Sequence, residues 1–204
     1  MSSVIDRVFY INLDKRTDRR QEIESEIQKV PGLWEKAERF AAIEHPNGCV
    51  GCTRSHLEVL RLAKARGYSQ ILVLEDDYMW IDGLEDKFNE RLLDFEPDYD
   101  VVMLTATIVE SVDSERENRI PDEKRIIKAH NAAGYLIHAR MFDRLIDAYE
   151  EAWPHLERTS AHWLYTIDVV WQRFQPESRW YFVKMGRQRP SYSDCANCHV
   201  DYDV

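Results

Sequence analysis

The chain has 204 residues, of which 44% are hydrophobic and 31% are charged, and its formal net charge is −10. That length and composition suit one ordinary globular domain, so we expect a single domain over residues 1–204. The negative charge excludes general nucleic-acid binding, which needs a basic face, and no apolar run is long enough to form a transmembrane helix.

The first half of the chain alternates between predicted strands and helices. Residues 7–13 are rich in aromatic and β-branched side chains and predict a buried strand. Residues 70–74 include four consecutive branched aliphatic side chains, as expected of a strand that is covered on both faces. A further short strand is expected at residues 40–43, and helices are expected at about residues 18–30, 55–65 and 83–95.

The second half shows the same alternation in weaker patterns. Strands are expected at residues 100–104, 135–137 and 180–183, and helices at residues 141–149 and 165–174. The charged segment 108–123 predicts a mobile loop, and the tail over about residues 188–204 predicts irregular structure. Strands that alternate with helices indicate an α/β fold with a mostly parallel sheet flanked by helices.

Three acidic residues, Glu75, Asp76 and Asp77, directly follow the strand at residues 70–74. The carboxyl ends of strands are where open α/β sheets bind ligands. Because alternate residues point to one side, Glu75 and Asp77 can share a hard cation such as Mg²⁺ or Mn²⁺. The alternative interpretation is a solvated acidic turn that caps the next helix.

Arginines follow the first strand at Arg16, Arg19 and Arg20, where their guanidinium groups can meet a diphosphate or a base. The alternative is a solvated helix start. His56 lies near the beginning of the helix at residues 55–65 and is either a ligand contact or a structural hydrogen-bonding residue.

The four cysteines form two C-x-x-C pairs, Cys49 with Cys52 and Cys195 with Cys198. If the fold brings the two pairs together, their spacing suits a structural Zn²⁺ site. Because the pairs are far apart in the sequence, four unrelated free thiols or a local redox pair remain the alternative interpretation.

Five segments in series resemble glycosyltransferase family 25, which includes the lipooligosaccharide galactosyltransferases of bacteria and the procollagen galactosyltransferases. They read YINLDKRTDRR, GCTRSHLEVL, ILVLEDD, NAAGYLIHARMFDRLI and PSYSD, and the resemblance as a whole covers Val8 to Asp194. The resemblance implies a Rossmann-like nucleotide-sugar-binding fold of the GT-A type, an inverting mechanism and a metal-assisted UDP-sugar donor.

The resemblance also implies roles for individual positions. Glu75 and Asp77 would hold the divalent metal, while contacts to the donor would come from Asn12, Leu13, Arg16, Ser55, His56, Asp76, Gly134 and Tyr135. Asp168 resembles the aspartate that family members carry between the Ala-Gly-Tyr motif and the Ser-Asp tail, and we expect it to be the general base. Asp194 is the next candidate, and a helix-capping or salt-bridged role is the alternative for Asp168.

These observations lead to one functional hypothesis and one rival. The hypothesis is a metal-dependent inverting transferase that moves galactose or glucose from a UDP-sugar to a glycan or protein-linked acceptor, as in lipopolysaccharide biosynthesis. The rival is a binding module of the same fold without transfer, motivated by a chain that stops soon after Asp194, where many relatives continue. Because the N-terminus lacks the features of a secretory signal, we expect a cytoplasmic protein.

Overall fold

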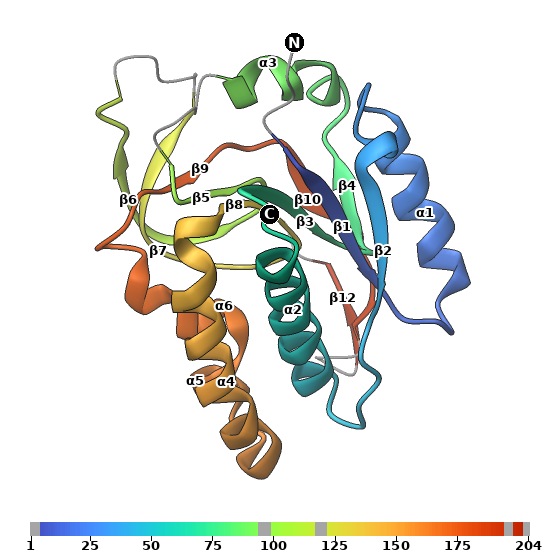
Figure 1. Ribbon diagram of the computed structural model, residues 1–204, viewed down its shortest axis with the longest axis vertical. Coiled ribbons are helices and arrows are strands. Elements are labelled where there is room, and N and C mark those ends of the chain that lie inside the picture. The colour runs from blue at the N-terminus through green and yellow to red at the C-terminus, as the bar shows by residue number, and fades with distance from the viewer. Residues whose placement is uncertain (1–4, 94–98, 117–121, 194–197, 202–204) are drawn as a thin grey trace.

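The computed structural model describes residues 5–93, 99–116, 122–193 and 198–201, and it forms an α/β sandwich built on one eight-stranded sheet (Figure 1). The strand order in this sheet is β2-β1-β3-β8-β5-β9-β7-β6. In chain order, its strands are β1 (Arg7–Asn12), β2 (Ala37–Ala41), β3 (Gln70–Glu75), β5 (Val101–Met103), β6 (Thr107–Asp113), β7 (Lys124–His130), β8 (Gly134–His138) and β9 (Trp180–Phe182).

Most strands of the sheet run in one direction. β1 pairs in parallel with β2 and β3, and β5 pairs in parallel with β9. β8 runs antiparallel between β3 and β5, and β7 runs antiparallel between β9 and β6. β7 and β8 therefore oppose the other six strands, which confirms the predicted mostly parallel sheet. The carboxyl ends of β1 and β3 meet at one edge of it.

Helices cover both faces of this sheet (Figure 1). α1 (Thr17–Gln28) packs on one face, and α2 (Gly48–Ala65) and α4 (Phe142–Thr159) pack against each other on the other face. The shorter helices are α3 (Phe88–Leu93), α5 (His162–Tyr165) and α6 (Ile167–Val170), with 3₁₀ turns η1 (Trp34–Lys36), η2 (Glu85–Lys87), η3 (Ala139–Met141) and η4 (Trp171–Phe174). Among the described residues, no helix combines the length and the hydropathy that a membrane span requires.

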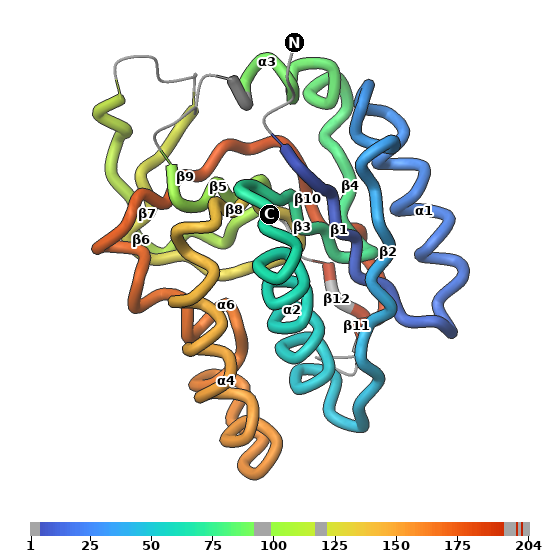
Figure 2. The backbone as a smooth tube through the Cα atoms, in the orientation of Figure 1, coloured from blue at the N-terminus to red at the C-terminus, as the bar shows by residue number. Residues whose placement is uncertain are grey.

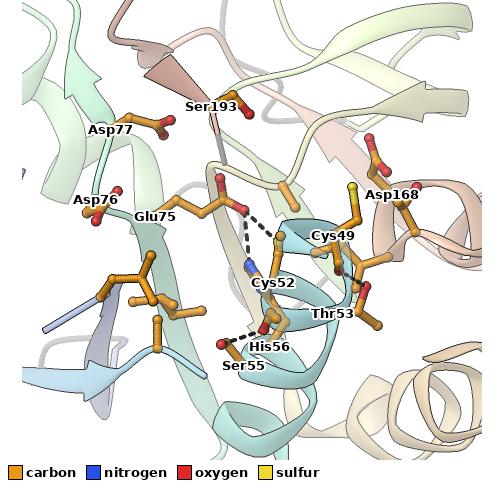
Figure 3. A pocket seen from close by; sticks show the side chains of 18 of the residues that line it. Cys49, Cys52, Thr53, Ser55, His56, Glu75, Asp76, Asp77, Asp168 and Ser193 are labelled. Carbon is orange, nitrogen blue, oxygen red and sulfur yellow. Dashed lines mark hydrogen bonds and ion pairs between the residues drawn. The ribbon is translucent and has the colours of Figure 1, made fainter. Parts of the chain in front are cut away.

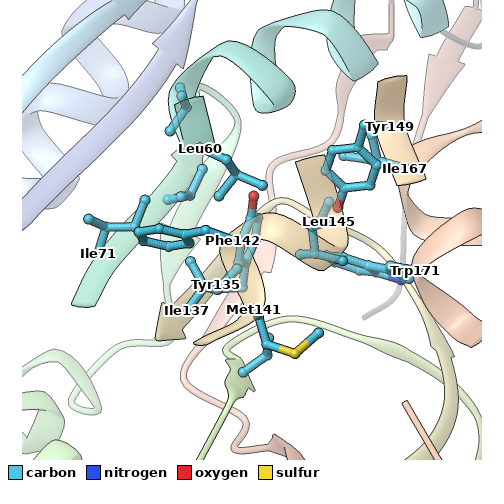
Figure 4. Close-up of a cluster of buried hydrophobic side chains, with 14 of the residues drawn as sticks. Leu60, Ile71, Tyr135, Ile137, Met141, Phe142, Leu145, Tyr149, Ile167 and Trp171 are labelled. Atoms are coloured by element: carbon cyan, nitrogen blue, oxygen red, sulfur yellow. The ribbon is translucent and has the colours of Figure 1, made fainter. Parts of the chain in front are cut away.

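The aliphatic run of β3 explains why the protein has two hydrophobic layers. Ile71 and Val73 belong to the layer under α2 and α4, part of which is drawn in Figure 4, whereas Leu72 and Leu74 belong to the layer under α1. All four side chains are fully buried. Burial of each contributes roughly 1.5–3 kcal/mol, which is why a strand without polar alternation is stable here. The prediction of a strand covered on both faces is confirmed.

The predicted loop at residues 108–123 is wrong over most of its described part. β6 pairs antiparallel with β7 as a hairpin at the edge of the sheet, with register shifts near Glu110, and residues 117–121 lie outside the described part of the chain. Nearly all of β6 is exposed, so neither of its faces carries the apolar alternation by which a half-buried strand is recognised.

The predicted irregular tail is also wrong where the chain is described. β10 (Gly186–Gln188) pairs with β4 (Tyr78–Trp80), and β11 (Ser191–Ser193) pairs with β12 (Cys198–Val200). Figure 2 follows the C-terminal chain back from β9 to β11 and β12. Each of these strands has three residues, which is too short for a periodic pattern to appear in the sequence.

Two helix boundaries differ from the prediction for local reasons. α2 begins at Gly48, seven residues before the predicted start at Ser55, because the Asn47 side chain accepts a hydrogen bond from the backbone N–H of Cys49 at 3.1 Å and caps the helix. The predicted helix at residues 165–174 is instead the end of α5, α6 and η4, because Thr166 has an extended backbone.

Candidate functional site

A pocket of about 640 Å³ opens where the carboxyl ends of β1 and β3 meet the start of α2. Small-molecule sites typically have volumes of about 300–1,000 Å³. Two groups of polar residues line it, and Figure 3 shows Asp76 and Asp77 on one side and Asp168 on the other. We call Glu75, Asp76 and Asp77 the carboxylate wall, and the opposite group, His130, Asn131 and Asp168, the facing wall.

Glu75, the first residue of the carboxylate wall, is held by α2. Its Oε1 lies 3.1 Å from Nε2 of the fully buried His56 and 3.6 Å from the Cys52 Sγ. The other ring nitrogen of His56 lies 2.9 Å from the Tyr135 hydroxyl. Burial alone would lower the pKa of His56, but Tyr135 and the carboxylate of Glu75 outweigh it and raise that pKa to about 9.

Asp76 is bound from two sides by groups that the first motif supplies. Asn12 Nδ2 donates to its Oδ2 at 2.8 Å, and the Arg19 guanidinium donates to its Oδ1 at 2.9 Å. Arg19 also contacts the Ser191 hydroxyl and the carbonyl of Tyr192 in β11, the latter at 2.7 Å. A buried ion pair of this kind fixes geometry more than it adds stability, so Arg19 ties α1, the carboxylate wall and the tail together.

Asp77 is the least compensated residue of the carboxylate wall. Its oxygens lie 3.4 Å from Gln188 Nε2, and its nearest guanidinium, that of Arg19, is 3.8 Å away. The pKa of Asp77 is raised to about 7, mainly because the carboxyl group is buried and secondly because of the neighbouring charge of Glu75. A buried carboxylate beside two others is the setting in which a divalent cation fits, because the cation offsets charges that the described side chains leave partly unpaired.

The facing wall is organised by Asn131, which has a φ of +84°. Its backbone N–H donates to Asp168 Oδ2 at 3.2 Å, and its side-chain amide donates to Gln188 Oε1 at 2.8 Å. Since Gln188 also donates to Asp77, a chain of polar contacts connects the two walls. A non-glycine residue in the left-handed region is strained and is often found at functional sites.

The structure brings most of the predicted site residues together. The pocket is lined by Leu13, Ser55, His56, Glu75, Asp76, Asp77 and Asp168. Asn12 and Tyr135 are not lining residues but contact them: Asn12 hydrogen-bonds to Asp76, and Tyr135 hydrogen-bonds to His56. Asp194 lies outside the described residues, but its neighbour Ser193 lines the pocket.

Arg16 and Gly134 have positions that the resemblance does not imply. The Arg16 side chain pairs with Asp18 at 2.9 Å and is not among the residues that line the pocket. At Gly134, a Cβ atom would lie 2.5 Å from the ring of Tyr78, so a glycine is needed to admit that buried ring, and Gly134 is not among the residues that line the pocket.

Only part of the predicted four-cysteine Zn²⁺ site lies among the described residues. Cys49 and Cys52 line the pocket, Cys198 begins β12, and Cys195 lies outside the described residues. No four-cysteine group occurs in the part of the chain that the structure describes. The ligand-bearing group that does occur there combines Cys52 with His56 and Glu75.

Sequence reasoning missed Asn131, His130 and Gln188 as site residues. Asn131 carries a weak signal, because a polar residue between a predicted strand and an Ala-Ala-Gly segment is typical of a tight turn. Gln188 carries none: the pairing of β10 with β4 sets it opposite Tyr78 and hence beside Asp77.

Comparisons with known proteins show the fold. No family model matches the chain, and no curated protein matches it. Among solved structures, a glycosyltransferase involved in the glycosylation of the major capsid of PBCV-1 is similar, with 12% identity, a TM-score of 0.52, and coverage of 87% of this chain and 81% of the other. The A197 protein from STIV is similar over 90% of this chain and 84% of the other, with 13% identity and a TM-score of 0.51. This likeness agrees with the predicted Rossmann-like fold; the resemblance to family 25 has no support at the level of a family model.

Proposed function

We propose that this chain is an inverting glycosyltransferase that moves a hexose, galactose or glucose, from a UDP-sugar to a hydroxyl of a glycan or protein-linked acceptor. The observation that carries this proposal is the pair of walls: three carboxylates at the end of β3 and a further carboxylate, Asp168, across one pocket. Inversion requires a leaving group and a general base on opposite sides of the anomeric carbon, and carboxylates on two sides of one pocket support that assignment.

The carboxylate wall fits a divalent cation, Mn²⁺ or Mg²⁺, held by Asp77 with Glu75. Such a cation, when bound, neutralises the charge that develops on the departing diphosphate. The protein's own net charge of −10 would otherwise repel that diphosphate. Arg19 also lines the pocket and adds positive charge beside the wall, where it pairs with Asp76 at 2.9 Å. Lys15 lines the pocket as well and pairs with Glu44 at 2.8 Å.

The donor nucleotide is best accommodated between the ends of β1 and β2. The pocket there is lined by the apolar side chains of Ile11, Leu13, Ala42 and Ile43, which suit a flat base. Ser55 closes this region from α2, where its hydroxyl donates to the Gly51 carbonyl at 2.7 Å and accepts from the Ile43 N–H at 2.8 Å.

Asp168 is suited to take the proton of the acceptor hydroxyl. Its Oδ2 accepts from the Asn131 N–H at 3.2 Å and lies 3.8 Å from His130 Nδ1. Within the described part of the chain, both of these contacts use one oxygen, which leaves Oδ1 for the acceptor.

The test is UDP release from UDP-galactose and UDP-glucose without an acceptor, measured with and without Mn²⁺. A competent transferase should release UDP slowly, and only with the metal. UDP should also raise the melting temperature in a Mn²⁺-dependent manner, because a ligand of the folded state stabilises it. Binding of a UDP-sugar without any UDP release would favour the non-catalytic binding module instead.

The variant Asp77→Asn should fold normally and lose the Mn²⁺-dependent part of its UDP affinity. Asp82→Asn is the matched control, because Asp82 is an exposed acidic residue of the same segment that does not line the pocket. Unchanged UDP affinity of Asp77→Asn in the presence of Mn²⁺ would remove the carboxylate wall from the donor site.

A further inference from the structure

Cys52, His56 and Glu75 form a compact group at one side of the pocket (Figure 3). One potential ligand atom from each lies within 4.8 Å of the other two. The Glu75 Oε1 is the central atom, at 3.1 Å from His56 Nε2 and 3.6 Å from Cys52 Sγ. Cys52 and His56 lie one turn apart on α2, so a regular helix presents both side chains to the end of β3.

Two of the three separations are close to the edges of a tetrahedral coordination sphere. Zn²⁺ binds nitrogen and oxygen at about 2.0–2.1 Å and sulfur at about 2.3 Å, which sets ligand atoms about 3.3–3.5 Å apart. The two measured separations differ from those edges by only a few tenths of an ångström. A thiolate, an imidazole and a carboxylate together favour a borderline cation over Mg²⁺ or Mn²⁺.

The surroundings of His56 also suit a metal ligand. Metal-binding histidines usually use their second ring nitrogen for a hydrogen bond that fixes the ring and its tautomer. Here the Tyr135 hydroxyl, 2.9 Å from Nδ1, supplies that contact, and the ring is fully buried. Cys52 and Glu75 are only half-buried and line the pocket, so a fourth coordination position would face the pocket.

We propose that Cys52, His56 and Glu75 bind one Zn²⁺-type cation whose fourth position is open to the pocket. This site goes beyond the proposed transfer reaction and differs from the Mn²⁺ or Mg²⁺ position at Asp77; Glu75 lies between the two. Three protein ligands and one open position are the arrangement of catalytic rather than structural zinc sites. The open position would take water or an oxygen atom of a bound ligand.

When the cation binds, its positive charge is balanced by the release of protons from the ligands. The cation takes the place of the proton between His56 and Glu75 and of the proton on the Cys52 thiol, and both protons leave to solvent. No oxidation or reduction is involved. Affinity for the cation should therefore increase as the pH rises.

The experiment uses Co²⁺ alone as the spectroscopic probe. The full chain is stripped of metal with a chelator, the chelator is removed, and Co²⁺ is titrated while the thiolate-to-cobalt charge-transfer band and the visible bands of tetrahedral Co²⁺ are recorded. We expect one Co²⁺ per chain, displaced by one Zn²⁺. Cys52→Ser should lose the charge-transfer band. Cys49→Ser is the matched control, a cysteine one turn earlier in α2, and it should keep the band.

Two further variants keep the proposal falsifiable if Cys52→Ser fails to fold. Tyr135→Phe should weaken Co²⁺ binding about 10–100-fold, the usual effect of losing a partner of a ligating histidine. Asp77→Asn should leave the Co²⁺ spectrum unchanged, which separates this site from the one in the proposed function. The proposal is overturned by a wild-type protein without the band, by a folded Cys52→Ser that keeps it, by loss of the band in Cys49→Ser, or by unaltered Co²⁺ affinity in Tyr135→Phe.

Discussion

On the carboxylate wall, the side chains of Asp76, Asp77 and Glu75 are 10%, 11% and 23% exposed, whereas that of Asp168 on the facing wall is 29% exposed. The carboxylate wall comes from three consecutive residues at the end of a buried strand, and Asn12, Arg19 and Gln188 fix its oxygens. The facing wall comes from α6, a helix of only four residues, and from the strained turn at Asn131.

This difference follows from what each wall has to bind in the proposed reaction. A diphosphate and its cation have the same charge and shape in every turnover, so donors and carboxylates can be fixed in advance. An acceptor has to enter and leave, and a half-buried wall on short helical turns allows that at lower cost. The predictions below test the contrast, beginning with the largest expected effect.

Replacing Arg19 with Met should destabilise the protein more than any other single change at the pocket. The variant leaves Asp76 buried without its ion-pair partner, which typically lowers the free energy of unfolding by about 3–5 kcal/mol. Arg20→Met is the control, because Arg20 makes an exposed pair with Glu24 and should change little. Urea unfolding measures both. Equal stabilities of the two variants would mean that the carboxylate wall does not depend on Arg19.

Replacing Asp168 with Asn should lower the transfer rate at least about a hundredfold, the lower end of the effect of losing a general base. UDP and Mn²⁺ affinities should stay unchanged, because Asp168 lies across the pocket from Asp77 (Figure 3). Asp143→Asn, at an exposed site on α4, is the control. Near-normal transfer by Asp168→Asn would move the assignment to Asp194 or to a group of the acceptor.

The contrast between the carboxylate wall and the facing wall also explains which parts of the fold and site could be predicted from the sequence. β3 and the acidic residues after it are local signals: consecutive aliphatic side chains need cover on both faces, and a strand end in an α/β sheet is a ligand position. The fold class was therefore predictable and is confirmed. The roles of Glu75, Asp77 and Asp168 stay predictions until the variants are measured.

The parts that sequence reasoning missed depend on contacts between distant segments. Gln188 reaches Asp77 only because β10 pairs with β4, and Arg19 contacts Ser191 only because the tail returns to α1. Cys52 meets Glu75 because α2 packs beside the end of β3. Short strands such as β10 carry too few residues for a pattern, so tertiary packing alone decides where they pair.

Asn131 allows the link between the two walls to be measured separately from the strain at the turn. Asn131→Gly removes the hydrogen bonds to Gln188, Thr105 and the Ala133 N–H and should lower the free energy of unfolding by about 1–2 kcal/mol. Asn131→Ala should lower it by about 1 kcal/mol more, because a φ of +84° is strained for alanine. Identical stabilities of the two variants would contradict the left-handed backbone at this position.

The smallest effect is expected from Asp100, a carboxylate at the opposite edge of the sheet from the pocket, because it precedes β5, which runs in the same direction as β3. Burial alone would raise the pKa of Asp100, but hydrogen bonds outweigh it and lower that pKa. They come from the Arg179 guanidinium at 3.1 Å, the Arg179 backbone N–H at 2.9 Å and the Arg140 guanidinium at 3.0 Å. The sign is therefore opposite to that at Asp77.

A lowered folded-state pKa contributes stability that is fully present above the unfolded value of about 3.9 and is lost as the pH falls through the folded value. Asp100→Asn removes this contribution. The difference in the free energy of unfolding between wild type and Asp100→Asn should therefore be largest near about pH 6 and should narrow by about pH 3, below the unfolded pKa. Urea unfolding at the two pH values measures this difference. A difference that is the same at both values would show that Asp100 and its arginines do not contribute to acid sensitivity, and a difference that widens in acid would reverse the sign argued here.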